Sequence, residues 1–272
     1  MRIDSSDEIN KILEHFSVFV DKPSEFVPFT NLNIVLDLDE TLVHTFENDD
    51  FKQTLNHEQI NFIRSRIFEY KIVDPNMNIE DSTYNIYGIM RPWLKLFLIF
   101  CFVYFKNVIV WSAGQPRYVM KIVDILFRDI FPPLIIYTQE DTEITDEFTH
   151  KPLKKLFRDS RLCNCGINEK NTIVIDDRSD TFSLNEMNGI CIPEFKPEKS
   201  FEELITNDPS LLQLIYWLMQ EDVMKTKDIR NLVKQNIFKE PYHFESLKRC
   251  RMVNGKLHCL SREVMNIVKK IH

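Results

Sequence analysis

Glycine is scarce in this chain of 272 residues, with only five present. A loop that wraps a phosphate group in backbone amides needs several closely spaced glycines, and no such pattern occurs. The sequence therefore excludes a nucleotide-binding loop of the Walker type. Any phosphate group would have to be held by side chains, by a metal ion or by the N-terminus of an ordinary helix.

The six cysteines lack the spacing of a disulfide framework, and the polar, mixed-charge N-terminus, residues 1–19, does not resemble a signal peptide. We therefore expect reduced thiols in an intracellular protein, nuclear or cytoplasmic and not secreted. Cys163 and Cys165 are spaced like half of a zinc site. No CxxC pair or nearby histidine completes that site, which argues against zinc there.

Long apolar runs are also missing. The most apolar stretch, residues 94–105, contains Lys95 and is far shorter than the ~20 residues that a membrane-spanning helix needs. We expect this stretch to form a buried helix, and we expect no association with a membrane.

Short apolar runs alternate with longer amphipathic segments over most of the chain. This alternation is typical of a Rossmann-like parallel sheet with right-handed crossovers and flanking helices, an α/β fold. The expected strands are residues 33–36, 107–111, 134–137, 172–175 and 189–192. The expected helices, besides 94–105, are residues 116–127, 151–157 and 201–219.

We divide the chain into an N-terminal arm, residues 1–27, a main domain, residues 28–224, and a basic helical extension, residues 225–272. Within the main domain, residues 46–90 form an insertion with a helix at 57–68 and strands at 68–73 and 84–90. The extension holds twelve Lys and Arg against four Asp and Glu, a net charge of +8. Such a tail suits nucleic acid or another acidic partner, although a solvated helical surface is the simpler explanation and the one we favour.

The first expected strand ends in Asp37 and Asp39, which begin on the same side because strand side chains alternate. Two carboxylates held that close repel each other unless a cation or a shared proton lies between them. At the carboxyl ends of other expected strands stand Ser112 and the pair Asp176 and Asp177, with Lys151 following the strand at 134–137. Ligands of open α/β sheets bind at this edge.

These residue types suit phosphoryl transfer. One aspartate can attack phosphorus while a second passes a proton, and Mg²⁺ prefers carboxylate and phosphate oxygens. A lysine and a hydroxyl group can stabilise the phosphate oxygens. Lys154 and Lys155 compete with Lys151 for that role.

The segment Asp37-Leu38-Asp39-Glu40-Thr41-Leu42-Val43-His44 closely resembles the signature of the FCP-like phosphatases. This family includes the small phosphatases of the RNA polymerase II C-terminal domain and belongs to the haloacid dehalogenase superfamily. The resemblance implies the haloacid dehalogenase type of fold. It also implies that Asp37 is the nucleophile and a metal ligand, and that Asp39 is the acid/base and supplies a second ligand through its backbone carbonyl.

Other positions match the family in chain order. The resemblance puts Ser112, Thr41 and Lys151 on the phosphate and Tyr118 against a peptide substrate. Asp177 stands where the family usually has an asparagine metal ligand, and Asp176 either binds the metal too or braces Lys151.

The resemblance implies a Mg²⁺-dependent phosphatase of phosphoserine or phosphothreonine in proteins, with the RNA polymerase II tail as one candidate substrate. Two alternatives use the same residues. One is a phosphatase of nucleic-acid 3′ ends, which the basic extension favours. The other is a catalytically silent binding module, against which the intact set of acidic, hydroxyl and lysine side chains argues. The sequence leaves the oligomeric state open.

Overall fold

A computed structural model describes residues 28–46, 50–73, 83–145, 148–197, 200–205 and 208–239. The predicted arm, residues 1–27, and most of the predicted basic extension, residues 240–272, lie outside this part of the chain. None of the helices in the described ranges is both long and apolar enough to cross a membrane.

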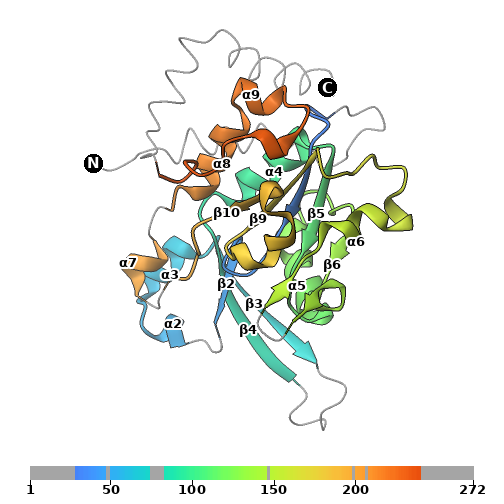
Figure 1. The fold of residues 1–272 in the computed structure, drawn as a ribbon. Helices are drawn as coiled ribbons and strands as arrows, with labels where there is room; N and C mark the ends of the chain where they lie inside the picture. The colour runs from blue at the N-terminus through green and yellow to red at the C-terminus, as the bar shows by residue number, and fades with distance from the viewer. Residues whose placement is uncertain are drawn as a thin grey trace, which may run out of the picture.

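A five-stranded sheet forms the centre of the molecule, with the order β10-β9-β1-β5-β6 and all neighbours parallel (Figure 1). Val35 of the middle strand lies between Ile109 and Val174 in register. This arrangement confirms the predicted α/β fold. The strands are β1 Asn33–Leu36, β5 Asn107–Trp111, β6 Ile136–Tyr137, β9 Thr172–Asp176 and β10 Gly189–Cys191.

Both faces of the sheet are buried, which explains why its strands read as continuous apolar runs. One face, with Ile34 and Val110, packs against α4, α5 and α8. The other face, with Val35 and Trp111, packs against α6 and the 3-10 helices η2 and η3. These helices are α4 Leu94–Tyr104, α5 Pro116–Phe127, α8 Ser210–Leu218, α6 Leu153–Arg158, η2 Ser160–Leu162 and η3 Ser179–Asn188.

The insertion folds as a small antiparallel sheet with the order β2-β4-β3. Its middle strand confirms the predicted strand near residues 84–90, but β2 was not predicted because it lies within the signature segment. The helix predicted over 57–68 ends at Ile63, since the following residues pair with β4 instead. The elements are β2 Val43–Phe46, α2 Asp50–Gln53, α3 His57–Ile63, β3 Ile67–Val73 and β4 Thr83–Met90.

The single helix predicted over 201–219 is wrong. The chain forms α7, Phe201–Leu204, and then α8, whose N-terminal flanking residue is Pro209. Proline lacks an amide hydrogen and clashes with the preceding turn, so it cannot lie inside a helix without disrupting it. The break places Asp208 at the entrance to α8.

Further short elements connect the larger ones. A two-stranded ribbon follows β6 and leads directly to Lys151. After α8, Ile229 is buried in the main core and its amide donates to the Lys170 carbonyl, so the described residues up to 239 pack on the domain body. These elements are η1 Gln139–Asp141, β7 Glu143–Ile144, β8 Thr149–His150, α9 Glu221–Met224 and η4 Ile229–Asn231.

Candidate active site

Lys151 lies between two carboxylates at the carboxyl edge of the sheet. Its Nζ is 2.6 Å from Asp37 Oδ1 and 2.6 Å from Asp176 Oδ2, and its side chain is only 2% exposed. Asp37 follows β1 and Asp176 ends β9, which are paired neighbours in the sheet. The Lys151 amide donates to the Thr181 carbonyl at 2.6 Å, which fixes the residue beyond β8. The fold thus brings together three residues that are far apart in sequence.

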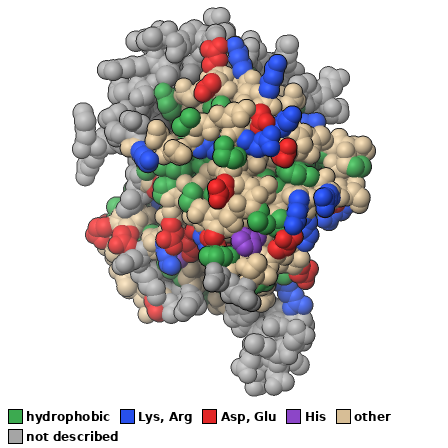
Figure 2. Space-filling view, viewed as in Figure 1, with side chains coloured by type: hydrophobic (Ala, Val, Ile, Leu, Met, Phe, Trp, Pro, Cys, Tyr) green, Lys and Arg blue, Asp and Glu red, His purple; other side chains and the backbone are tan. Residues whose placement is uncertain are grey.

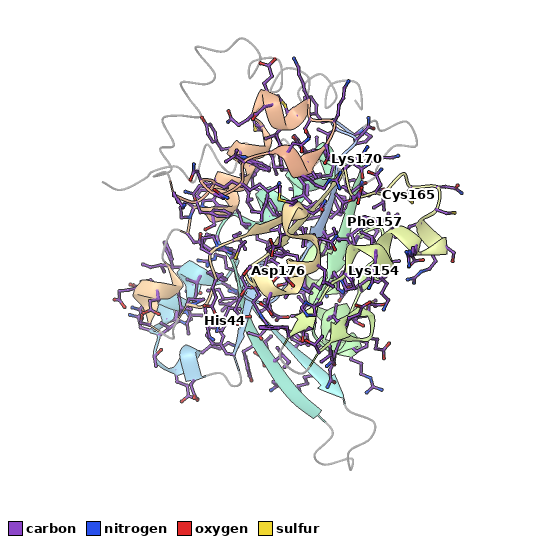
Figure 3. The ribbon with its side chains drawn as sticks, viewed as in Figure 1. His44, Lys154, Phe157, Cys165, Lys170 and Asp176 are labelled. Atoms are coloured by element: carbon purple, nitrogen blue, oxygen red, sulfur yellow. The ribbon has the colours of Figure 1, made fainter. Side chains whose placement is uncertain are left out.

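The structure separates Lys151 from its two predicted competitors. The Lys154 side chain is 59% exposed and lies 3.3 Å from Glu143, while Lys155 lies 3.5 Å from Asp141. Figure 3 shows Asp176 near the middle of the molecule and Lys154 out on α6. Helix α6 begins only at Leu153, so Lys151 precedes the helix that carries the other two lysines.

Asp176 uses both of its carboxylate oxygens within the protein. Oδ2 accepts from Lys151, and Oδ1 accepts from the Arg178 amide at 2.9 Å. Of the two roles that the sequence left open for Asp176, these contacts correspond to bracing Lys151.

Asp177 is bound to Thr41, which is fully buried. The Thr41 hydroxyl donates to Asp177 Oδ1 at 3.2 Å and accepts from the Asp177 amide at 3.1 Å. Thr41 therefore ties the loop after β1 to the loop after β9. Burial, reinforced by the neighbouring charge of Asp176, raises the pKa of Asp177 to about 6.

Asp39 lies in a different environment from Asp37. Its carboxylate accepts hydrogen bonds from the Tyr118 hydroxyl and, at 3.4 Å, from the Ser112 hydroxyl. Burial raises the pKa of Asp39, and the bond from Tyr118 opposes that rise. Tyr118 was predicted to contact a peptide, and here its hydroxyl touches the acid/base candidate. Ser112 also accepts from the Gly114 amide at 3.0 Å, which orients its side chain.

Burial raises the pKa of Asp37 well above its ordinary range, and the carboxylates of Asp176 and Asp39 reinforce this rise against Lys151. Burial by itself would lower the pKa of Lys151, but the charges of Asp37 and Asp176 outweigh it and raise that pKa. One lysine does not balance the carboxylates of Asp37, Asp39 and Asp176. The remaining negative charge favours the binding of a cation.

The donor set fits a hard divalent cation. Carboxylate oxygens of Asp37, Asp176 and Asp177 lie within 4.8 Å of one another, and Mg²⁺ prefers oxygen ligands. The Asp39 carboxylate is not in this group. Among the described residues, Cys163 and Cys165 do not belong to a group of three acidic, Cys or His ligands.

Sequence reasoning missed Arg91, which is fully buried beneath the same loop. Its guanidinium donates to the Thr41 carbonyl at 2.9 Å. A charged residue between an apolar strand and a proline was the available signal, but the role of Arg91 depends on partners 50 or more residues away.

Fold and site together define an α/β domain whose central strands end in three neighbouring carboxylates, two of them buried, beside a buried lysine. The chain belongs to the NLI interacting factor-like phosphatase family, whose model matches residues 32–230. This membership confirms the resemblance to the FCP-like phosphatases that the signature indicated.

The chain is similar to a "Probable C-terminal domain small phosphatase" from Dictyostelium discoideum. The two are 25% identical over 203 residues, which cover 75% of this chain and 54% of the relative. The chain thus spans about half the length of this curated relative.

Two solved structures are also similar to the chain. One is Fcp1, described as an essential RNA polymerase II CTD phosphatase, with 14% identity, a TM-score of 0.48 and coverage of 85% of this chain and 62% of that one. The other is a variant of fission yeast Fcp1 bound to beryllium fluoride, with 16% identity, a TM-score of 0.47 and coverage of 98% and 69%.

Proposed function

We propose that this protein is a Mg²⁺-dependent phosphatase that hydrolyses phosphoserine or phosphothreonine in a protein substrate through an aspartyl-phosphate. The observation that carries the proposal is the unequal environment of two neighbouring aspartates. Asp37 is bound to a lysine, whereas Asp39 is bound to two neutral hydroxyl groups. Carboxylates that differ in this way can take different roles in one reaction.

Asp37 is the proposed nucleophile. Lys151 holds one of its oxygens at 2.6 Å, which fixes the direction of the carboxylate. Attack on phosphorus forms the Asp37–phosphate bond and breaks the bond to the seryl or threonyl oxygen of the substrate. Lys151 and Ser112 are positioned to stabilise the phosphate oxygens during this transfer.

Asp39 is the proposed acid and base. Burial favours its protonated form, which can give a proton to the leaving oxygen. As a carboxylate it can then take a proton from the water that hydrolyses the aspartyl-phosphate. Tyr118 holds the carboxyl group in place in both steps, which leaves the Ser112 hydroxyl free to donate to the phosphate.

The carboxylates of Asp37 and Asp177 and the backbone carbonyl of Asp39 would hold Mg²⁺. When bound, the ion would offset the repulsion between the Asp37 carboxylate and the phosphate dianion. Thr41 positions Asp177 for this role through its two hydrogen bonds, and Asp176 keeps Lys151 directed at the site.

A phosphoprotein is the proposed substrate class, because the curated relative is named as a small phosphatase of a C-terminal domain. The tail of RNA polymerase II is therefore a candidate substrate, and a nuclear location would follow from it. On the face shown in Figure 2, acidic and basic side chains are interspersed. Among the described side chains on that face, the basic ones form no continuous surface that would support the 3′-end alternative.

The decisive experiment compares native protein with Asp37→Asn on p-nitrophenyl phosphate, a phosphoserine peptide and a 3′-phosphorylated oligonucleotide, with Mg²⁺ and with EDTA. We expect Mg²⁺-dependent release of phosphate from the first two substrates and a loss of at least about 10³-fold in the variant. Asp124→Asn, on the exposed surface of α5, is the matched control and should keep native turnover. Undiminished turnover in Asp37→Asn would exclude the mechanism, and a preference for the oligonucleotide would exclude the substrate class.

A further inference from the structure

Arg91 is a fully buried cation that the proposed chemistry does not use. Besides the Thr41 carbonyl, its guanidinium donates to the Pro193 carbonyl at 2.6 Å and to the Asp208 carboxylate. The guanidinium also lies over the Phe195 ring, at 5.5 Å from the ring centre. One side chain thereby joins the loop after β1, the segment after β10 and the entrance to α8.

The loop that Arg91 holds contains unfavourable backbone geometry. Glu40, between Asp39 and Thr41, has a φ of 54°, a left-handed conformation that side chains other than glycine seldom adopt. Such a conformation persists only where the surroundings enforce it. Arg91 binds the carbonyl of Thr41, and the Phe195 amide donates to the Glu40 carbonyl at 2.6 Å. Both bonds clamp the backbone directly beside Asp39.

Asp208 supplies the charge that balances Arg91. Its Oδ2 lies 2.8 Å from Arg91 Nε and 2.7 Å from Nη2, and its side chain is 16% exposed. Its Oδ1 accepts from the Ser210 amide at 2.8 Å, at the start of α8. Helix α8 in turn packs in the main core with α4, which begins just after Arg91. Asp208 therefore connects a well-packed helix to the guanidinium.

A buried guanidinium needs both a counter-charge and partners for its donors, because an uncompensated charge is costly away from water. If the Asp208 charge is removed, the lowest-energy response is for Arg91 to move toward water or toward another acid. Either movement breaks its bonds to the Thr41 and Pro193 carbonyls. The loop that carries Asp37 and Asp39 then loses its support at the strained residue.

We propose that Asp208 is a positioning residue that holds the loop of Asp37 and Asp39 in its reactive geometry, acting through Arg91. This inference rests on the proposed phosphatase function for its kinetic consequence but not for its structural one. Misplacing reacting groups by about 1 Å can lower a rate by about 10²-fold even when the mutated residue lies away from the chemistry.

The test uses the full chain with Asp208→Asn, which keeps an oxygen acceptor for the Ser210 amide but replaces the oxygen that accepts from Arg91 with an uncharged NH2 group. We expect kcat on p-nitrophenyl phosphate to fall at least about 10-fold, with KM changed by less than about 3-fold. We also expect at least about 10-fold faster hydrogen exchange at the amides of residues 38–43, because local opening becomes easier. Asp208→Ser, which can also cap α8, serves for both measurements if the asparagine variant is too poorly folded.

Asp228→Asn is a closely matched control. Asp228 is 17% exposed, binds an arginine and accepts from the amide two residues ahead, as Asp208 does, but its partner is Arg230. This variant should keep native kcat and native exchange at residues 38–43.

Hydrogen exchange measured without substrate distinguishes a failure of the positioning role from a failure of the proposed phosphatase function. If the native chain releases no phosphate but Asp208→Asn still accelerates exchange, the proposed function fails and the positioning role stands. If kcat falls while exchange at residues 38–43 stays native, or if both stay native, the positioning role is overturned. If Asp228→Asn lowered kcat as much as Asp208→Asn does, the positioning role would also be overturned.

Discussion

Two buried cations contact the loop after β1, and they are held in different ways. Lys151 is enclosed by the carboxylates of Asp37 and Asp176, whereas Arg91 has one carboxylate, Asp208, and two backbone carbonyls. An ammonium group is a compact charge on a flexible stem, while a guanidinium is a planar group with several fixed donors. Lys151 is thus suited to follow charge that changes during a reaction, and Arg91 to fix backbone that must not move.

Of the two buried cations, Lys151 should have the larger effect on activity. Lys151→Gln keeps a hydrogen-bond donor but removes the charge that faces Asp37 and the incoming phosphate. We expect kcat/KM on p-nitrophenyl phosphate to fall by about 10² to 10³-fold, the range for a lost electrostatic stabiliser. Steady-state kinetics with saturating Mg²⁺ measure this fall. A loss below about 5-fold would show that Lys151 does not serve the phosphate.

Of the two buried cations, Arg91 should have the larger effect on the free energy of unfolding. Arg91→Met removes the buried guanidinium and leaves Asp208 and the Thr41 and Pro193 carbonyls without their donor. We expect the free energy of unfolding to fall by about 3 kcal/mol, because breaking one side of a buried ion pair is strongly destabilising. Urea unfolding monitored by circular dichroism measures this change. An unchanged midpoint would contradict the structural role assigned to Arg91.

Asp177 should make the proposed metal site sensitive to pH. Its pKa of about 6 lies above the ordinary value, so the metal-free folded chain binds an extra proton between about pH 4 and pH 6. The folded state therefore loses this contribution to stability as pH rises through 6, and a bound cation restores it. We expect Mg²⁺ to raise the urea midpoint more at pH 7.5 than at pH 5. In Asp177→Asn this difference between the two pH values should shrink, and an undiminished difference would remove Asp177 as its source.

The smallest effect is expected at Lys154, the exposed competitor of Lys151. Its 3.3 Å contact with Glu143 is an exposed ion pair, and such pairs contribute about 0–1 kcal/mol. Lys154→Ala should leave kcat within about 2-fold of native and the urea midpoint nearly unchanged. A larger fall in kcat would indicate that the phosphate binds beside α6. That result would contradict the assignment of the phosphate-binding role to Lys151 and not Lys154.

Most of the central sheet was predictable because its signals are local. An apolar run that ends in Asp37 predicts β1, and the amphipathic pattern over 116–127 predicts α5 with the same bounds. The errors came where local patterns compete. The helix predicted over 57–68 gives way to a turn at residues 64–66, and pairing with β4 begins at Ile67. Pro209 divides the segment that was predicted as one helix over 201–219.

The α/β class, the family and the strand ends that carry the candidate site residues could be predicted from the sequence. They follow from hydrophobic periodicity and from a short motif, both of which depend on neighbouring residues. That Lys151 and not Lys154 meets Asp37, and that Asp176 contacts this lysine, depends on how distant segments pack. The support of the loop by Arg91 and Asp208 depends on packing in the same way. The contacts Lys151–Asp176, Arg91–Asp208 and Arg91–Thr41 join residues at least 25 positions apart, and the burial that sets their strength exists only in the folded chain.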